Sequence, residues 1–434
     1  MQKTDQILDT NAIVYSGVPW YDQNGETVNA HAGCVVHFDG KYFLFGEYKT
    51  DTSNEFSGFS CYSSTDLCNW HFEGLALPPQ ESGLMGPQRV GERVKVAHCP
   101  ATGKFVMFAH SDDMGYRDPV TVVALAENIA GPYKLVGPLE YQGQPLRRWD
   151  LGLFQDYDGS AYVLYHEGEI FRLSPDFCCA DTQVVSNCAP GGESPAIVRH
   201  EDQYFWMFSN KTSWDRNDNY YLTSTSLSGP WENKGLFAPV GTQTWDSQCG
   251  HIFDVQMDNG NVTSIYMGDR WSYPEQKSSA TYVWMPLQFD RDTLCLPDFW
   301  DAWDPATASS VQAEGTFKSV HFDSEEPGNT FTWDFCIGEA DLANRLAIRQ
   351  FPGPDGGYAE VTIRGSKGSF SQVIDCYSKD LREKFAFVSN VLSPGSYSAS
   401  IKVLGRQSEF WKKDGTRLGS NGFRVNIQSV GVIQ

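Results

Sequence analysis

The sequence lacks several features that mark common classes of protein. Its 434 residues include only 33 basic side chains against 54 acidic ones, which gives a formal net charge of −21. This shortage of positive charge argues against nucleic acid or an anionic membrane surface as a partner. No apolar run reaches the roughly 18 residues of a transmembrane helix, so no membrane span is expected. Residues 1–6 also lack the charged-then-apolar pattern of a secretory signal.

Cysteines are present but not in the spacings of a metal site or a disulfide framework. There are 11 of them, Cys178 and Cys179 are adjacent, and no Cys-x-x-Cys pair occurs. Reduced, largely buried thiols are the expected state. Together with the missing signal pattern, this predicts a cytoplasmic protein. A secreted protein is the alternative if a signal peptide has been removed.

Helix signals are few, whereas aromatic residues are abundant, with 13 Trp, 20 Tyr and 27 Phe. What recurs is a short turn followed by an aromatic-rich strand, and glycine after an acid or amide between two apolar runs is a hairpin signal. The copies are spaced by roughly 40 to 65 residues, which indicates a repeated four-stranded unit. An all-β fold with a five-bladed β-propeller is therefore predicted. The five copies lie at 39–45, 102–108, 158–165, 200–208 and 259–267.

The repeat pattern ends at the aromatic cluster 299–305, and the small and polar residues 306–312 resemble a linker. From residue 313 to 434 apolar and polar residues alternate between Gly, Pro and Ser turns, as in a jelly-roll-like β-sandwich. We therefore expect a catalytic propeller over residues 1–305 and an accessory β-sandwich over 313–434. The second domain would bind sugar or serve as a packing partner.

Four carboxylates lie where the innermost strands of the blades should begin or end: Glu47, Glu92, Asp150 and Glu193. Innermost strands surround the propeller axis, so acids far apart in sequence can converge there. Glu193 follows two glycines and precedes Ser-Pro, at the start of an apolar run where the backbone can pass close to a ligand. Glycoside hydrolysis needs such convergence, because one acid protonates the leaving oxygen while a base activates water. Glu193 is the predicted proton donor.

Six motifs spread in order along residues 29 to about 305 resemble glycoside hydrolase family 43, and within it the exo-β-1,3-galactanase subgroup. The resemblance implies a five-bladed propeller that hydrolyses glycosides with inversion at the anomeric carbon. The motifs are Ala30-His31-Ala32-Gly33 with residues 45–49, then residues 92–96, 150–159, 193–196, 244–248 and 266–271.

The resemblance also implies roles for matching residues. Glu193 would be the general acid, and Asp150 would tune it and hold the sugar. The other matches would line the sugar pocket: the carboxylates of Glu47 and Glu92, and the rings of Tyr116 and Trp214, for which packing alone is the alternative. Trp149 departs from the subgroup, which usually carries a polar or basic residue there, and so do Lys211-Thr212-Ser213. These departures leave the exact sugar open.

The base is the unusual part of the pattern. Most of family 43 uses an aspartate on the first blade, but residues 28–33 contain no acid. The galactanase subgroup shares this absence and has a glutamine on the last blade, which matches Gln248. A neutral amide is a very poor base, so Gln248 is expected to position the water or to act through its imidic tautomer. Glu92 is the alternative acceptor of the proton.

No cofactor or metal is expected. His98, His110, His166 and His251 lie near strand ends without His-x-x-x-His or close His-x-x-Cys spacing. A structural cation on the propeller axis is compatible with the sequence but not required by it. Gly-rich phosphate loops and the Gly-x-Ser-x-Gly elbow are also absent.

Three functions remain open, all with an oligo- or polysaccharide as partner. The first is an exo-acting hydrolase of galactose-containing chains, or of a related arabinofuranoside, xyloside or galactofuranoside. The second is a glycoside phosphorylase, for which Arg93, Arg147 and Arg148 could supply a phosphate site. The third is a non-catalytic sugar-binding propeller.

Overall fold

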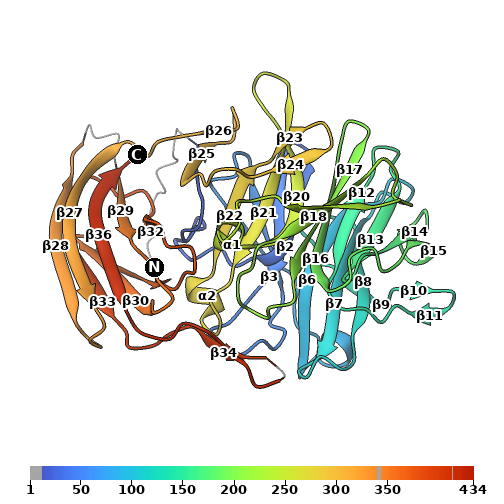
Figure 1. The fold of residues 1–434 in the computed structure, drawn as a ribbon, viewed down its shortest axis with the longest axis horizontal. Coiled ribbons are helices and arrows are strands. Elements are labelled where there is room, and N and C mark those ends of the chain that lie inside the picture. Colours follow the sequence, from blue (N-terminus) through green and yellow to red (C-terminus); the bar gives the residue numbers. More distant parts are fainter. Residues whose placement is uncertain (1–11, 340–343, 413) are drawn as a thin grey trace.

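The structure is a computed structural model, and it describes residues 12–339, 344–412 and 414–434. Of the expected domains, residues 1–11 of the first and residues 340–343 and 413 of the second lie outside this range. Strands dominate, and Figure 1 shows a set of blades beside a sandwich of two curved sheets. The predicted all-β class, a five-bladed propeller followed by a β-sandwich, is confirmed. None of the described helices has the length and hydropathy needed to cross a membrane.

The first two blades are four-stranded antiparallel sheets in which chain order equals spatial order. Blade 1 contains β2 (His31–Phe38), β3 (Lys41–Glu47), β4 (Phe59–Ser64) and β5 (His71–Leu77). Blade 2 contains β6 (Arg89–His98), β7 (Phe105–Asp113), β8 (Val120–Ala126) and β9 (Lys134–Pro138), and the 3-10 helix η1 (Gly83–Met85) precedes it.

The other three blades vary this unit. Blade 3 contains β12 (Gly152–Gln155), β13 (Ala161–Tyr165), β14 (Glu169–Leu173) and β15 (Ala180–Val185), extended by β10 (Glu140–Tyr141) and β11 (Gln144–Pro145). Blade 4 contains β16 (Gly192–His200), β17 (Gln203–Asn210), β18 (Tyr220–Ser224) and β19 (Glu232–Leu236). Blade 5 has three strands, β20 (Gln248–Gln256), β21 (Val262–Arg270) and β22 (Thr281–Pro286), rather than the predicted four.

The innermost strands close into a ring, because β2 contacts β6, β6 contacts β12, and the contacts continue through β16 and β20 back to β2. The N-terminal segment lies against the outer strand of blade 5, where the amide of Gly17 donates a 2.6 Å hydrogen bond to the carbonyl oxygen of Tyr282. All five predicted turns connect an innermost strand to the second strand of its blade. Of the four acids assigned to innermost strands, Glu47 is the exception, because it ends the second strand, β3.

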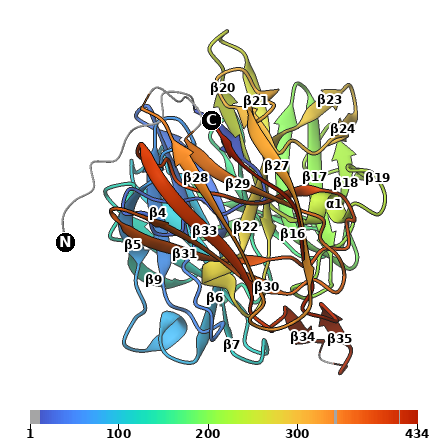
Figure 2. The ribbon, with the colours of Figure 1, turned by 90° about the vertical axis from the view of Figure 1, so that its left-hand side faces the viewer.

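The sandwich consists of two four-stranded sheets that enclose a separate apolar core. One sheet has the order β27 (Gly315–Ser324), β36 (Val425–Ile433), β29 (Arg345–Gln350) and β32 (Lys384–Val388). The other has the order β28 (Thr330–Ile337), β33 (Gly395–Val403), β30 (Tyr358–Gly365) and β31 (Gly368–Asp375). Figure 2 shows this sandwich in front of the blades.

Short elements join the two parts (Figure 1). The expected linker 306–312 contains β26 (Ser309–Ser310), which pairs with β25 (Ala302–Asp304), which in turn pairs with β1 (Val14–Tyr15). The linker is therefore partly a strand of a small sheet. The remaining elements are β23 (Gln288–Asp290) with β24 (Thr293–Cys295), the hairpin β34 (Glu409–Trp411) and β35 (Arg417–Gly419), and the turns α1 (Gln243–Asp246) and α2 (Gln276–Ser279).

A buried charge network holds the sandwich against the propeller. Asp246, at the end of α1, lies 3.3 Å from Nζ of Lys384 on β32, 3.5 Å from Nε of Arg216 and 3.6 Å from Nε of Arg270. Burial opposes ionisation of Asp246, but these cations, Lys384 foremost, lower its pKa well below the usual range. All four residues of α1 have left-handed φ values between 52° and 63°. This strained turn ends two residues before Gln248 and needs support from its surroundings.

Replacing Lys384 by methionine should therefore destabilise the whole chain. The substitution leaves Asp246 buried with one cation fewer, and breaking a buried ion pair from one side costs about 3–5 kcal/mol. We expect a clearly lower unfolding midpoint in guanidinium chloride. The control is Lys104→Met, which breaks the exposed pair of Lys104 with Glu127 and should leave the midpoint near the wild-type value. Equal midpoints for the two variants would contradict the role of Lys384.

Candidate active site

Equivalent positions at one end of the ring carry most of the predicted site residues. In four blades a residue near the start of the innermost strand pairs with the second strand, and a β-bulge follows, so that three residues of the inner strand face two of its neighbour. Bulges of this kind redirect side chains and are frequent beside active sites. The pairs are His31 with Glu47, Glu92 with His110, Glu193 with Ser209 and Gln248 with Asp269.

The third blade follows the same pattern. Its pairing starts with Gly152 opposite Leu164. In the other blades, three steps along the inner strand match two steps along its neighbour. The same steps, counted from Gly152 and Leu164, put Trp149 opposite His166. Nδ1 of His166 indeed lies 2.9 Å from the carbonyl oxygen of Trp149. The five equivalent residues are called the ring residues below, and they are His31, Glu92, Trp149, Glu193 and Gln248.

The residue after the ring residue has a left-handed backbone in four blades. The φ values are 48° for Ala32, 56° for Arg93, 55° for Asp150 and 59° for Ser194. None of them is glycine, and non-glycine residues in this region are strained, a feature that clusters at functional sites. The strain turns Arg93 and Asp150 toward each other, with Nε of Arg93 2.8 Å from Oδ1 of Asp150.

Arg93 connects all five blades. From blade 2, its backbone amide donates a 2.8 Å hydrogen bond to Oε1 of Glu47 in blade 1. Its guanidinium reaches Asp150 in blade 3, Oγ of Ser194 in blade 4 at 2.7 Å, and Oε1 of Gln248 in blade 5 at 2.9 Å. The side chain is buried, so its charge acts on the surrounding carboxylates with little screening.

Gln248 uses the full hydrogen-bonding capacity of its amide. Oε1 accepts from Arg93 and from Nε1 of Trp271, each at 2.9 Å. Nε2 donates to Oε1 of Glu193 at 3.0 Å and to Oγ of Ser209 at 2.8 Å. An amide oxygen has two lone pairs and an amide nitrogen two hydrogens. A water that binds to Oε1 must therefore replace one of the two donors.

Glu193 holds its proton at neutral pH. Burial of the carboxyl and repulsion from the charge of Asp150 raise its pKa to about 8, against the opposing effects of Arg93 and Lys211. Because Gln248 donates to Oε1, the proton of the neutral acid belongs on Oε2, where it is available to a ligand. A carboxylic acid kept neutral in this way suits general acid catalysis.

Glu92 and Asp150 are the opposite case and stay ionised. Oε1 of Glu92 accepts 2.6 Å and 2.9 Å hydrogen bonds from the Tyr116 hydroxyl and from Nδ2 of Asn54. Burial opposes ionisation, but His110 and Lys49 lower the pKa of Glu92 well below its usual range. For Asp150 burial is outweighed by Arg93 and by the Ser194 amide, which lower its pKa.

His110 itself becomes a cation in this environment. Burial disfavours its charged form, but the hydrogen bond to Asp112 and the nearby carboxylate of Glu92 raise the pKa of His110 to about 9. Its ring nitrogens lie 3.3 Å from Asp112 and 3.5 Å from Glu92. The ionised Glu92 therefore has a buried positive partner on the adjacent strand.

The two other predicted residues, Glu47 and Trp214, meet at Lys49. Oε2 of Glu47 lies 2.5 Å from Nζ of Lys49, and burial raises the pKa of the Glu47 carboxyl although Lys49 opposes this. Nζ of Lys49 lies 5.3 Å from the ring centroid of Trp214 and 5.8 Å from that of Trp271. Trp214 also stacks on Tyr273 at 5.5 Å. These rings form an aromatic wall beside the carboxylates.

The structure thus brings all seven predicted residues into one network, either directly or through one intermediate side chain. Sequence reasoning assigned no site role to Lys49, Trp271 or His110, and it considered Arg93 only as part of a phosphate site. Arg93 had a usable signal, because it is a charged residue in the apolar strand that directly follows Glu92. Lys49 and Trp271 each end one of the six motifs. For His110 only strand pairing reveals the contact.

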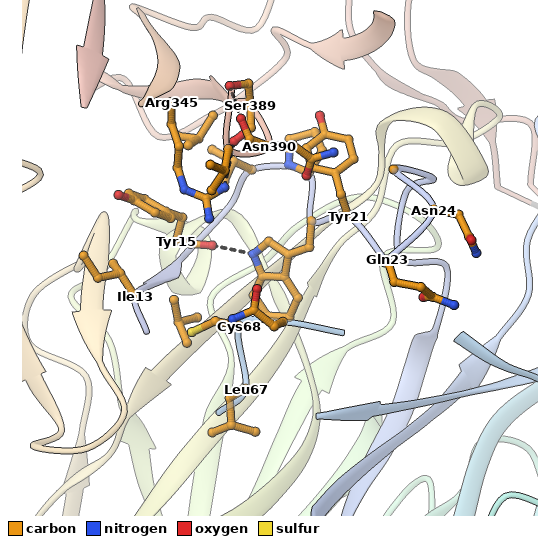
Figure 3. A pocket seen from close by; sticks show the side chains of 18 of the residues that line it. Ile13, Tyr15, Tyr21, Gln23, Asn24, Leu67, Cys68, Arg345, Ser389 and Asn390 are labelled. Atoms are coloured by element: carbon orange, nitrogen blue, oxygen red, sulfur yellow. Dashed lines mark hydrogen bonds between the residues drawn. The ribbon is translucent and has the colours of Figure 1, made fainter. Parts of the chain in front are cut away.

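A cavity of about 930 Å³ lies away from these residues, between the first blade and the sandwich (Figure 3). Trp20, whose Nε1 donates a 2.7 Å hydrogen bond to the carbonyl oxygen of Tyr15, lines it together with Arg345 and Asn390. No carboxylate is found among the described residues that line it, and no ring residue borders it. The acid chemistry therefore belongs to the ring and not to this cavity.

No metal centre is evident in the described part of the chain, where no group of three or more His, Cys, Asp or Glu is arranged to hold an ion. That the protein needs no metal or cofactor stays a prediction. The buried cysteines, among them Cys34 and Cys249, are thiols in the structure.

Comparisons with known proteins agree with this arrangement. The sequence model described as glycosyl hydrolases family 43 matches residues 39–276. No curated protein sequence matches the chain.

Among solved structures, an exo-β-1,3-galactanase from Phanerochaete chrysosporium with galactose is 27% identical, with a TM-score of 0.72, and the match covers 97% of this chain and 100% of that one. A candidate exo-β-1,3-galactanase from Bifidobacterium bifidum is 33% identical over 68% of this chain and 98% of that one, with a TM-score of 0.60. A family 43 β-1,3-galactosidase with galactodeoxynojirimycin is 27% identical over 67% of this chain and 100% of that one, also with a TM-score of 0.60.

The environment of Glu193 predicts how its pKa responds to a neighbour. Replacing Asp150 by asparagine removes the repelling charge and frees Arg93 from its partner, so the pKa of Glu193 should fall clearly below 8. NMR of protein carrying ¹³C in its glutamate carboxyls measures this, with the Glu193 signal identified by its loss in Glu193→Gln. The control Asp158→Asn, in an exposed turn of the same blade, should leave the titration unchanged. A Glu193 pKa that stays the same or rises in Asp150→Asn would contradict this account.

Proposed function

Since the chain belongs to the glycosyl hydrolases of family 43 and is a glycoside hydrolase, we propose that it removes galactose from the ends of β-1,3-linked galactan chains with inversion at the anomeric carbon. The observation that carries the proposal is that the same ring contains a neutral acid, Glu193, and an ionised carboxylate, Glu92. The choice of galactose and of the β-1,3 linkage is supported by the likeness to exo-β-1,3-galactanases along almost the whole chain.

In this proposal Glu193 donates its proton from Oε2 to the glycosidic oxygen as the bond to the anomeric carbon breaks. Water adds to that carbon from the opposite face, and its proton leaves to an acceptor on that side. Asp150 raises the pKa of Glu193 and, with Arg93, keeps it in place. The terminal galactose lies between the carboxylates of Glu47 and Glu92, with the rings of Tyr116 and Trp214 bordering it.

The acceptor of the water proton is assigned to Glu92, with Gln248 as a positioning group. Glu92 and Glu193 belong to blades that are not neighbours in the ring, since β12 lies between their strands. A donor and an acceptor on different blades suit a mechanism in which water adds from the face opposite the leaving group. Gln248 Oε1 already accepts two hydrogen bonds. The water-positioning role of Gln248 stays a prediction, and it requires the water to displace Arg93 or Trp271. The lowered pKa of Glu92 makes it a weak base, so the proton transfers late in the reaction.

The phosphorylase alternative has little support, because the three arginines that favoured it are paired with acids. Arg93 binds Asp150, Nη1 of Arg147 lies 2.5 Å from Asp118, and Arg148 forms an ion pair with Glu169. A phosphate would have to displace a carboxylate from each of them.

The first test offers β-1,3-galactobiose to the wild type and to Glu193→Gln. Loss of the proton donor should lower kcat about 10²- to 10⁴-fold. The control Glu201→Gln, at an exposed turn of the same blade, should keep full activity. Proton NMR of the product should detect α-galactose first, as inversion requires. Equal activity of wild type and Glu193→Gln would refute the assignment, and β-galactose as first product would refute inversion.

The second test is the pH dependence of kcat/KM for β-1,3-galactobiose. The donor must be protonated, so activity should fall as pH rises through about 8, the pKa of Glu193. β-Galactosyl fluoride needs no protonation of its leaving group, so its hydrolysis should lack this alkaline limb and should survive in Glu193→Gln. Glu92→Gln should lose activity on both substrates. An alkaline limb shared by both substrates would contradict the role of Glu193.

A further inference from the structure

One ring residue has no part in the proposed chemistry, although the fold puts it beside the acid. Trp149 occupies in blade 3 the position that Glu92 occupies in blade 2 and Glu193 in blade 4. Its blade lies next to that of Glu193, since β12 contacts β16. The two strands approach closely, because a Cβ at Gly152 would lie 2.2 Å from the carbonyl oxygen of Pro195. Equivalent backbone positions direct equivalent side chains to the same end of the ring.

Trp149 differs from the other ring residues in its exposure. His31 and Gln248 are buried and Glu92 and Glu193 are partly buried, whereas the Trp149 side chain is 43% exposed. An indole that is this exposed keeps a large apolar face available to a ligand. Its place in the ring, beside residues that are otherwise polar, suggests a ligand contact and not a share in the apolar core.

The indole is nevertheless held by fixed neighbours. The ring of His166 meets the indole edge-on at a centroid distance of 5.4 Å. Nδ1 of His166 lies 2.9 Å from the backbone carbonyl oxygen of Trp149. On either side in the sequence, Arg148 pairs with Glu169 and Asp150 pairs with Arg93. A ring whose backbone is anchored in this way loses little conformational entropy when a ligand covers it.

We propose that Trp149 is the binding platform for the sugar on the leaving-group side of the scissile bond. The inference rests on the proposed function, since it takes Glu193 as the proton donor. The donor must reach the glycosidic oxygen, so the sugar beyond that oxygen lies beside Glu193, where Trp149 stands. Galactose has an apolar face formed by its C–H groups, and such a face packs well on an indole.

A polar pair completes this side of the site. Nζ of Lys211 lies 2.7 Å from Oε1 of Glu167, which follows His166 in the chain. Lys211 is close enough to Glu193 for its charge to oppose the rise of the Glu193 pKa. The leaving-group sugar would thus meet the indole on one side and hydrogen-bonding groups of Lys211 and Glu167 on the other. Trp149 would determine which chains the enzyme accepts without taking part in bond cleavage.

The test compares two substrates in Trp149→Ala and Trp149→Phe. β-1,3-Galactobiose has a sugar on the leaving-group side, whereas β-galactosyl fluoride has none. In Trp149→Ala we expect kcat/KM for galactobiose to fall about 10-fold, mostly through KM, which is a typical effect for an aromatic contact. The value for the fluoride should stay within about 2-fold of wild type, because the terminal galactose keeps all its contacts. Trp149→Phe should recover most of the loss.

The matched control is Tyr157→Ala, which removes an aromatic side chain that is 72% exposed in the turn between β12 and β13. It should leave both substrates unaffected. An equal loss on both substrates in Trp149→Ala would show a general role in site structure and overturn the platform, as would an unchanged kcat/KM for galactobiose. If the wild type hydrolyses neither substrate, the proposed function itself fails and the platform is withdrawn with it, an outcome that differs from every variant-specific result.

Discussion

The arrangement of the site depends on one buried cation. Arg93 lies on the innermost strand of blade 2. Its backbone amide and guanidinium bind one partner from each of the other four blades: Glu47, Asp150, Ser194 and Gln248. A buried guanidinium is stable only when carboxylates and oxygen acceptors surround it, and the ring of bulged strands supplies them. The same charge keeps Asp150 ionised within the ring. If Arg93 were removed, the blades would lose their common partner and the site would gather uncompensated negative charge.

The surroundings of the acids in the site give them different protonation states. Asp150 and Glu92 have cationic partners, Arg93 and His110, that lower their pKa values. For Glu193, burial and the repulsion of Asp150 outweigh the opposing effects of Arg93, Lys211 and Gln248, so its pKa rises to about 8. Chemically similar side chains thus acquire opposite protonation states through their neighbours alone. An acid and an ionised carboxylate can then work at the same pH, which is what a glycoside hydrolase of this kind requires.

Residues of the sandwich support the site through contacts with the propeller. Lys384 binds Asp246 at the end of a turn with four left-handed residues, and this turn leads into Gln248. Nearby, the Tyr377 hydroxyl donates a 3.0 Å hydrogen bond to Asp215, the residue after Trp214. The hydroxyl of Tyr358 likewise donates to the carbonyl oxygen of Ser272, next to Trp271. The sandwich therefore supports the residues that carry the aromatic wall and the amide.

The sequence by itself determined the class of fold and the order of the blades, because turn residues such as Asp39-Gly40 and Asn259-Gly260 and the alternation of aromatic strands are local signals. It also predicted a site at Glu193, Asp150, Glu92 and Gln248, whose neighbours form recognisable motifs, and the structure brings these four residues together. It could not reveal that Glu47 ends a second strand, that blade 5 has three strands, or that Arg93 joins all five blades. Those facts depend on strand pairing and on contacts between residues as far apart as Arg93 and Gln248.

The equivalence of Trp149 with Glu193 arose only from the register of the bulges, since chemically unlike residues share no sequence pattern. Protonation states, too, were decided by the tertiary structure, because burial and neighbouring charge set each pKa.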